Sequence, residues 1–515
     1  MKNILKEFLE GKLEKRGYQF WIINAILQAR SNGKNVIIEL DAGMGKRIIA
    51  YLIARLFSSE KILIITPSRA SVWDMVSTFR ELSNSDSWFG VVIGGLPRGL
   101  KLRNLEKRRV IIATPISLAR IMEHRPEIAK KIDIVIINEV DKVIRRVPSW
   151  RNINMIRHMQ NYGPEDDNTM ILSYPWNILK RYLPEDACWI GMSGTLRDEH
   201  YLVSEDGIRV QKELDTIARA LYPRKPLVII SMDKLIERTD AREYIVKNLT
   251  VMHPVPVSDP KIKILVDCIT KEIDDVVQKI AEYNKGLYPG EQTPFDTKEK
   301  IHRTISVLPD SNPLKIKFLR LALARRHIFA SIPSVYRRFI SKPMFRRIVM
   351  KYSGRRLEEL IPEDSAKVNR IIDVCRRWME VSKSNIIIVT SFIRTAVYIW
   401  RRLKEGLKIE VLLLTGRTYN KRAVIEEFRK RKPCILILTP VAERDLDFPE
   451  AELVIIHDVI STVKSMYQRI KRARRSRVLV LYYADTFEEK KVHVLLSRMA
   501  RRYPWSIRIM SPYKK

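Results

Sequence analysis

A short glycine-rich run with one lysine follows the first apolar strand pattern of the chain. Between Asp41 and Arg47 the sequence reads D-A-G-M-G-K-R, and a helical pattern comes after it. Gly43 and Gly45 allow the backbone to wrap closely, so that N–H groups and the N-terminus of the next helix face a phosphate group. Lys46 would then lie at the outer phosphates of a nucleotide. The alternative is a tight strand–helix turn with a chance lysine, and the strand before it and the helix after it favour the phosphate-binding loop.

Acidic residues end another apolar strand pattern. Ile134–Ile137 is followed by N-E-V-D, an arrangement in which a first acid usually holds Mg²⁺ and a following glutamate polarises the attacking water. The first position here is the neutral Asn138, whereas Glu139 is present. At the other usual metal position, after Lys46, Arg47 replaces a hydroxyl residue and offers no acceptor atom. Arg47 would repel a cation or bring its own charge near the phosphates; the alternative for the whole segment is an exposed acidic loop.

The elements that must position these residues are short apolar strands alternating with helical patterns. In the first half the predicted strands are Val36–Glu39, Ile62–Thr66, Val91–Gly94, Arg109–Ala113, Ile134–Ile137 and Trp189–Met192. Near the C-terminus they are Asn385–Thr390, Glu410–Leu414, Cys434–Thr439, Leu453–His457 and Val478–Tyr483. Such alternation favours parallel sheets covered by helices on both faces. The sequence therefore predicts an α/β fold with two lobes.

A mainly helical segment separates the two lobes. Pro254, Pro256 and Pro260 mark a boundary after the first lobe, and the pattern that follows them is helical. We predict a first lobe over residues 1–250, a basic helical insertion over residues 251–366 and a second lobe over residues 367–515.

The charge of the chain points to a polyanionic partner. Lys and Arg number 94 against 59 Asp and Glu, a formal net charge of +35, which favours nucleic acid or an acidic membrane. Membrane is the weaker choice, because no apolar run approaches the ~20 residues of a spanning helix and the charged N-terminus does not resemble a signal peptide. The 4 cysteines lie far apart and have no metal-ligand or disulfide spacing. We expect a cytoplasmic protein that binds nucleic acid.

Cations are concentrated in the helical insertion. Between Pro313 and Leu360 the acids are Glu358 and Glu359, against many lysines and arginines. We expect salt-dependent phosphate contacts from Arg337, Arg338, Arg346, Arg347, Arg355 and Arg356. The interleaved aromatic residues, which could stack on bases, are Tyr336, Phe339, Phe345 and Tyr352. For the aromatics a core position is favoured, and for the cations the alternative is a solvated helix face.

Several segments follow the order and spacing of helicase motifs. They are Arg16–Gln19, Gly43–Lys46, Thr66–Arg69, Ala113–Pro115, Asn138–Asp141, Gly191–Thr195, Ile386–Arg394, Thr439–Pro449 and Gln468–Arg475. On these motifs the chain resembles superfamily 2 helicases, and within them the branch of the archaeal Hef helicase and its Fanconi-M and XPF relatives. The resemblance covers nearly the whole chain. It implies two RecA-like lobes of the P-loop NTPase fold, with the helical segment where Hef has a thumb-like insertion.

The resemblance also implies roles for individual residues. ATP or ADP would be held by Gln19, Gly43, Gly45, Lys46, Arg47, Asp447 and Gln468. Gln19 ends the run R-G-Y-Q, which is similar to the R-x-Y-Q motif that reads adenine in this family. The catalytic positions, vestigial if hydrolysis is lost, would be Glu139, Arg472 and Arg475. The DNA-contacting positions of the first lobe would be Thr66, Arg69 and Thr114.

Departures from the family pattern concentrate at the metal position and at tight glycines. Arg47 and Asn138 stand at the two direct Mg²⁺ positions, and Asp141 replaces a histidine. The replaced glycines are at Asp445, Lys471 and Arg474. Phosphoryl transfer depends on positioning and charge stabilisation, with Mg²⁺ a principal part. We therefore expect no metal ligands and hydrolysis slowed by several orders of magnitude.

Three functions stay open. The favoured one is a non-hydrolysing scaffold on branched or duplex DNA in repair or replication, working with a separate nuclease or repair factor. The second is an active ATP-dependent DNA translocase that uses Glu139 and a metal site shifted to Asp141. The third is an RNA- or ribosome-associated binder, because phosphate contacts do not report the sugar. No E-R-K-x-x-x-D signature is found, so we expect the nuclease half of Hef or XPF to be missing.

Overall fold

The structure is a computed structural model. It describes residues 13–41, 43–83, 85, 88–144, 174–204, 207–221, 225–246, 249–287, 305, 308–309, 311–439, 451–459, 463–470 and 477–510. The chain divides into two compact units, one of Met1–Asp198 with Lys212–Val246 and the other of Glu199–Gln211 with Lys247–Lys515. Each unit is described by itself below.

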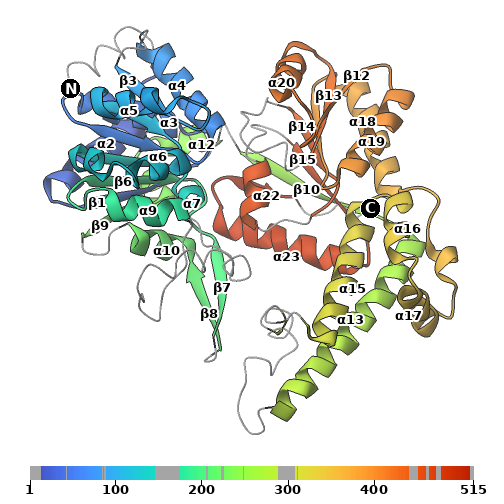
Figure 1. The fold of residues 1–515 in the computed structure, drawn as a ribbon. Helices are drawn as coiled ribbons and strands as arrows, with labels where there is room; N and C mark the ends of the chain where they lie inside the picture. Colours follow the sequence, from blue (N-terminus) through green and yellow to red (C-terminus); the bar gives the residue numbers. More distant parts are fainter. Residues whose placement is uncertain are drawn as a thin grey trace. The chain divides into compact units, whose positions relative to one another are not determined.

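The first unit is built on a parallel sheet of seven strands in the order β3-β4-β2-β5-β6-β1-β9 (Figure 1). The strands are β1 (Asn35–Glu39), β2 (Ile62–Ile65), β3 (Phe89–Val92), β4 (Val110–Ala113), β5 (Ile134–Asn138), β6 (Cys188–Ser193) and β9 (Leu227–Ile230). Every residue of β1, β2, β4, β5 and β6 is buried, as expected for a parallel sheet covered on both faces. The predicted strands are all present, although β3 lies two residues earlier than predicted because the chain turns at Gly95, whose φ is 94°.

Helices connect these strands. They are α2 (Gly17–Ser31), α3 (Lys46–Leu56), α4 (Arg69–Ser83), α5 (Arg98–Lys107), α6 (Pro115–Met122), α7 (Val140–Val143), α9 (Tyr174–Tyr182), α10 (Glu213–Ala220), α11 (Met232–Arg238) and α12 (Ala241–Val246), with a 3₁₀ turn at Pro126–Lys131. A separate two-stranded sheet consists of β7 (Glu199–Ser204) and β8 (Gly207–Lys212).

The second unit contains another seven-stranded parallel sheet, in the order β12-β13-β11-β14-β15-β10-β16. Its strands are β10 (Thr250–Val257), β11 (Ile386–Val389), β12 (Glu410–Leu414), β13 (Cys434–Leu438), β14 (Leu453–Ile456), β15 (Arg477–Tyr483) and β16 (Ile507–Ile509). Its helices are α18 (Ala366–Val381), α19 (Ile393–Gly406), α20 (Lys421–Lys430), α22 (Val463–Ile470) and α23 (Phe487–Arg502). The prediction of two parallel α/β lobes is therefore confirmed.

Strand β10 was not predicted, because its prolines suggested a boundary. Pro254 and Pro256 lie inside β10, level with Val480 and Tyr482 of β15. On its other side β10 pairs with β16 only as far as Met252. The prolines therefore lie where one side of the strand needs no ladder hydrogen bond, the position in which proline is tolerated. The predicted domain limits stay predictions, but the sheet of the second unit begins within the range assigned to the insertion.

The helical segment between β10 and α18 consists of α13 (Pro260–Leu287), α15 (Pro313–Ala330), α16 (Pro333–Ile340), α17 (Pro343–Ser353) and a 3₁₀ turn at Leu357–Leu360. We call it the helical insertion. Helices α13 and α15 run side by side (Figure 1). One hydrophobic cluster contains Ile273 of α13, Leu321 of α15 and Ile386 of β11. The insertion thus shares its core with the second sheet.

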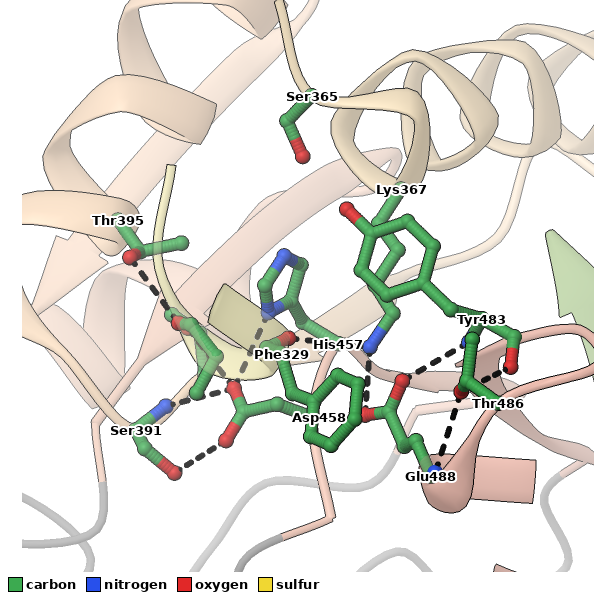
Figure 2. Close-up of polar contacts among 12 residues, drawn as sticks. Phe329, Ser365, Lys367, Ser391, Thr395, His457, Asp458, Tyr483, Thr486 and Glu488 are labelled. Atoms are coloured by element: carbon green, nitrogen blue, oxygen red, sulfur yellow. Dashed lines mark hydrogen bonds and ion pairs between the residues drawn. The ribbon is translucent and has the colours of Figure 1, made fainter. Parts of the chain in front are cut away.

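A buried ion pair strengthens this junction (Figure 2). Lys367 Nζ lies 2.7 Å from Glu488 Oε1, and the two side chains are 0% and 1% exposed. Lys367 also donates to the carbonyl of Phe329 at 3.1 Å, and Glu488 accepts from the backbone N–H of Tyr483 at 2.8 Å. Thr395 donates to the carbonyl of Ala330 at 3.2 Å. The C-terminal end of α15 is therefore fixed to α18, α19 and α23 by polar contacts that exclude water.

Removing one partner of this pair should be costly, because the other charge stays buried without compensation. Lys367→Met is expected to lower the free energy of unfolding by about 3–5 kcal/mol. The double variant Lys367→Met, Glu488→Gln should lose less than the sum of the two single variants. Chemical denaturation followed by circular dichroism measures both. Additive losses would mean that the two groups do not interact.

Candidate nucleotide and nucleic-acid sites

The loop after β1 has the geometry of a phosphate cradle. Gly43 and Gly45 have φ of 83° and 80°, and Gly45 precedes the first residue of α3, Lys46. Lys46 Nζ donates to the loop carbonyls of Leu40 at 2.9 Å and Asp41 at 3.3 Å. Burial lowers the pKa of Lys46, although Glu139, Asp41 and Asp141 oppose this shift. Lys46 thus lies over the loop, at the N-terminus of a helix with no acid in its first turn.

Helix α2 packs directly on this loop. The Tyr18 hydroxyl donates to the carbonyl of Met44 at 2.9 Å, and Gln19 Nε2 lies 3.5 Å from that hydroxyl. A Cβ atom on Gly45 would stand 2.7 Å from Gln19 Nε2. Gly45 is therefore required both by its positive φ and by the approach of Gln19. The structure brings together Gln19, Gly43, Gly45 and Lys46, which the sequence predicted as nucleotide-binding residues.

Arg47 extends towards α4. Its Nη1 donates to the carbonyl of Asp74 at 3.4 Å, and the side chain is half-buried. This contact holds part of the guanidinium against the backbone of α4.

Residues that follow β5 face those that follow β6. Both oxygens of the buried Asp141 carboxylate accept hydrogen bonds, from Ser193 Oγ at 2.5 Å and from Thr195 Oγ1 at 2.8 Å. Glu139, whose φ is 53°, forms an ion pair with Lys142. From the sequence, Asp141 is a departure from the family pattern and the shifted metal position of the translocase alternative. The structure instead shows its carboxylate bound by two hydroxyls, and the signal for this contact is an acid two residues after Glu139 together with the S-x-T spacing of Ser193 and Thr195.

Asn138 ends β5 and is buried. Its Oδ1 atom has no hydrogen-bond partner among the residues that the structure describes. Within the same described ranges, no group of three or more His, Cys, Asp or Glu side chains is placed to hold a metal ion.

The predicted nucleic-acid residues of the first lobe lie at one edge of its sheet. Thr66 and Thr114 follow the neighbouring strands β2 and β4, and Thr66 N donates to the carbonyl of Ala113 at 3.0 Å. Thr66 Oγ1 is buried without a hydrogen-bond partner in the described part of the chain. Arg69, the exposed first residue of α4, lies so close to the next loop that a Cβ on Gly94 would be 2.6 Å from its Nη2. The three predicted residues therefore lie at the same edge of the sheet, and Gly94 lies beside Arg69.

The predicted arginines of the helical insertion are all exposed. They are Arg337 and Arg338 of α16, Arg346 and Arg347 of α17, and Arg355 and Arg356 beyond it. Arg346 forms an exposed ion pair with Glu358 at 3.0 Å. Tyr336 and Phe345 are 1% and 2% exposed, so the core interpretation of these aromatics is confirmed.

Other cations of the insertion are structural. Glu272 of α13 accepts from Lys317 and, at 3.2 Å, from Lys351. Burial would raise the pKa of Glu272, but hydrogen bonds from Lys317, Tyr352 and Lys351 outweigh it and lower the pKa. Lys315 is buried and donates to the carbonyl of Leu308. Nothing in the sequence distinguishes these bound lysines from the exposed cations.

Several predicted residues lie outside the described residues. Asp447, Arg472 and Arg475 belong to this group, as does the side chain of Gln468, which falls in α22. Their roles stay predictions.

Comparisons with known proteins agree with this geometry. Residues 17–197 match the DEAD/DEAH box helicase family model, and residues 366–477 match the helicase conserved C-terminal domain. The chain has the two-domain core of a superfamily 2 helicase. The Hef helicase domain of Pyrococcus furiosus is similar in structure, with a TM-score of 0.59 and 20% identity over 94% of this chain and 98% of that one. At this identity the likeness concerns the fold.

Two further helicase structures are more distant. A hypothetical ATP-dependent RNA helicase from Sulfolobus tokodaii has a TM-score of 0.31 and 14% identity, covering 95% of this chain and 99% of that one. A Saccharomyces cerevisiae Dbp5 variant bound to RNA and ADP BeF3 has a TM-score of 0.48 and 14% identity, covering 93% and 85%. A search of curated proteins finds no match. Among the described residues of this helicase-like chain, no helix is long and apolar enough to cross a membrane.

The hydrogen bonds of Asp141 provide a test of the first lobe. Asp141→Ala leaves two buried hydroxyls, those of Ser193 and Thr195, without their acceptor and is expected to cost about 2–4 kcal/mol of stability. Asp141→Asn keeps one acceptor oxygen and should cost less. Urea denaturation of both variants measures the difference. Equal stability of Asp141→Ala and the unaltered protein would show that these bonds do not hold β5 and β6 together.

Proposed function

We propose that the chain is a helicase-like DNA-binding protein that holds an adenine nucleotide, hydrolyses it very slowly or not at all, and acts as a scaffold on branched or duplex DNA in repair or replication. The observation that carries the proposal is the pair of residues at the metal position. Arg47 offers no acceptor and contacts α4 instead. Asn138 offers one uncharged oxygen.

Mg²⁺ is a hard cation that binds carboxylate, hydroxyl and phosphate oxygens. Arg47 and Asn138 supply neither a carboxylate nor a hydroxyl group, so they do not fit this ion. Two nearby carboxylates are already engaged, Asp141 by Ser193 and Thr195, and Glu139 by Lys142. This arrangement argues against the alternative of an active translocase with a metal shifted to Asp141. Nucleotide binding itself needs the loop N–H groups, Lys46 and Gln19, and it is supported by the positive φ of Gly43 and Gly45 and by the place of Lys46 at the start of α3.

The magnitude of the loss follows from transition-state stabilisation. Removing charge stabilisation at a reacting phosphate costs several kcal/mol. At about 1.4 kcal/mol per factor of ten, hydrolysis would fall by several orders of magnitude. The nucleotide would then serve as a bound ligand of the first lobe.

Nucleic-acid binding is supported by the exposed arginines of the helical insertion and by the converging edge of the first lobe. The preference for DNA over RNA rests on the resemblance to the Hef branch. A separate nuclease or repair factor is the proposed protein partner, by analogy with that branch.

Restoring the metal ligands is the sharpest test of slow hydrolysis. The unaltered protein should show no DNA-stimulated ATPase activity, whereas Arg47→Thr with Asn138→Asp should gain turnover that requires Mg²⁺. Phosphate release with and without duplex DNA measures both, and Glu139→Gln added to the restored variant is the control. Turnover of roughly 1 s⁻¹ or more by the unaltered protein, abolished by Glu139→Gln, would overturn the scaffold proposal.

The arginines provide an independent test. Arg337→Gln with Arg338→Gln should weaken binding to forked DNA and reduce the slope of log affinity against log salt by roughly 1–2. The matched control is Arg376→Gln with Arg377→Gln, two exposed neighbours in α18. Fluorescence anisotropy at several salt concentrations measures the slope. An equal effect of both pairs would mean that net charge alone sets affinity, and tighter binding to RNA than to DNA of the same shape would favour the RNA-binding alternative.

A further inference from the structure

The last segment of the first unit is tied to both parts of the candidate nucleotide site. This segment, α11 with α12 and the turn between them, lies beyond the residues that match the DEAD/DEAH box model. At its start, Met232 N donates to Glu39 Oε2 at 3.0 Å. Glu39 is 4% exposed and ends β1, directly before the phosphate-binding loop.

The turn between α11 and α12 caps helix α2. The Asp240 carboxylate accepts from the backbone N–H of Gly17 at 2.7 Å and of Tyr18 at 2.6 Å. These two N–H groups begin the helix that carries Gln19, and helix α2 has no acid in its own first turn. A Cβ on Gly17 would stand 3.0 Å from the carboxylate, so the close approach of Asp240 favours glycine there. A carboxylate that accepts free N–H groups at a helix N-terminus both satisfies them and interacts favourably with the helix dipole.

Helix α12 adds an aromatic contact to this cap. The ring of Tyr244 lies edge-to-face against Tyr18, with centroids 5.4 Å apart. The Arg16 guanidinium lies over the Tyr244 ring at 4.8 Å and donates to the Tyr18 hydroxyl at 3.3 Å. That hydroxyl in turn donates to Met44 of the phosphate-binding loop. Asp240 and Tyr244 therefore hold the backbone and the ring of the residue that joins α2 to the loop.

The same segment is also the C-terminal part of the first unit. Helix α12 ends at Val246, which is the last residue of that unit, and the first strand of the second sheet, β10, begins at Thr250.

We propose that Asp240 is a positioning residue for adenine recognition, which fixes Gln19 over the phosphate-binding loop. This inference rests on the proposed binding of an adenine nucleotide. Asp240 does not touch the nucleotide; it acts through α2. Loss of the cap should therefore weaken recognition of the adenine base, whereas the phosphate-binding loop should keep its affinity for the phosphates.

The test compares base recognition with phosphate binding. Isothermal titration with ATP, GTP and inorganic tripolyphosphate is carried out on the full chain and on Asp240→Ala. We expect Asp240→Ala to weaken ATP binding about tenfold, equivalent to about 1.4 kcal/mol, and to leave GTP and tripolyphosphate binding nearly unchanged. The ratio of ATP to GTP affinity is the readout, because a general loss of folded protein would lower all three affinities together.

Three further variants sharpen the result. Asp240→Asn keeps an acceptor oxygen at the cap and should restore most of the discrimination. Tyr244→Leu removes the ring contact, leaves the cap in place and should lower discrimination by itself. Glu243→Ala removes an exposed carboxylate from the same helix and should change nothing.

The outcomes separate the inference from the proposed function. An unaltered protein that binds no nucleotide, or that does not distinguish ATP from GTP, overturns the adenine site and this inference with it. Discrimination that is intact in Asp240→Ala overturns the inference alone. Equal weakening of ATP and tripolyphosphate also overturns it, since Asp240 would then support the fold and not the reading of the base.

Discussion

Parallel pairing of β5, β6 and β1 is the constraint on which the candidate nucleotide site depends. The three strands are neighbours, with Ile137 level with Gly191 and Ile38 level with Met192. Because they run in the same direction, the segments that follow them reach the same edge of the sheet, where ligands bind in open α/β folds. The N–H of Leu40 donates to the carbonyl of Ser193 at 2.9 Å, and Ser193 donates to Asp141. Backbone pairing thus brings the segments together, and a few polar contacts fix them.

The second lobe has a sheet of the same topology but no glycine-containing loop after the strand that corresponds to β1. Its strand order corresponds position by position to that of the first sheet, with β14 in the place of β5, and Asp458 follows β14 much as Glu139 follows β5. Asp458 is buried and accepts from Thr390 at 3.2 Å and from Ser391 N and Oγ at 3.0 and 2.5 Å (Figure 2). Burial would raise the pKa of Asp458, but hydrogen bonds from His457 and Ser391 outweigh it and lower the pKa. The same topological position therefore holds a structural carboxylate in one lobe and Glu139 in the other.

The difference between the lobes is also visible at the start of the helix after the equivalent central strand. In the first lobe, a glycine-containing loop lies between Glu39 and Lys46, and no side chain caps the N-terminus of α3 at Gly45. In the second lobe, β10 ends at Val257, and Asp259 Oδ1 accepts from the N–H groups of Lys261 and Ile262 at 3.1 Å. A carboxylate cap already occupies the place that a phosphate would take.

What the sequence revealed followed from local patterns. Buried parallel strands are continuous apolar runs, so most of the central strands were predicted within two residues, whereas the edge strands β9 and β16 were missed. A glycine loop before a helix is recognisable without the rest of the chain. Strand β10 was missed because Pro254 and Pro256 are tolerated only by the shortness of β16, which no local pattern reports. Asp240 was missed because its partners, Gly17 and Tyr18, are 223 and 222 residues away.

The role of each charge was the property hardest to predict from the sequence, because a count of cations does not distinguish those that hold the fold together. In the helical insertion, Lys317 and Lys351 are held by Glu272 of α13, 45 and 79 residues away. The cations left at the surface of α16 and α17 include the four arginines Arg337, Arg338, Arg346 and Arg347. This division has a physical basis. A lysine is a compact charge that satisfies a partly buried carboxylate, whereas the planar guanidinium forms paired hydrogen bonds to phosphate. Glu272 of α13 therefore holds Lys317 and Lys351, whereas these arginines of α16 and α17 remain exposed.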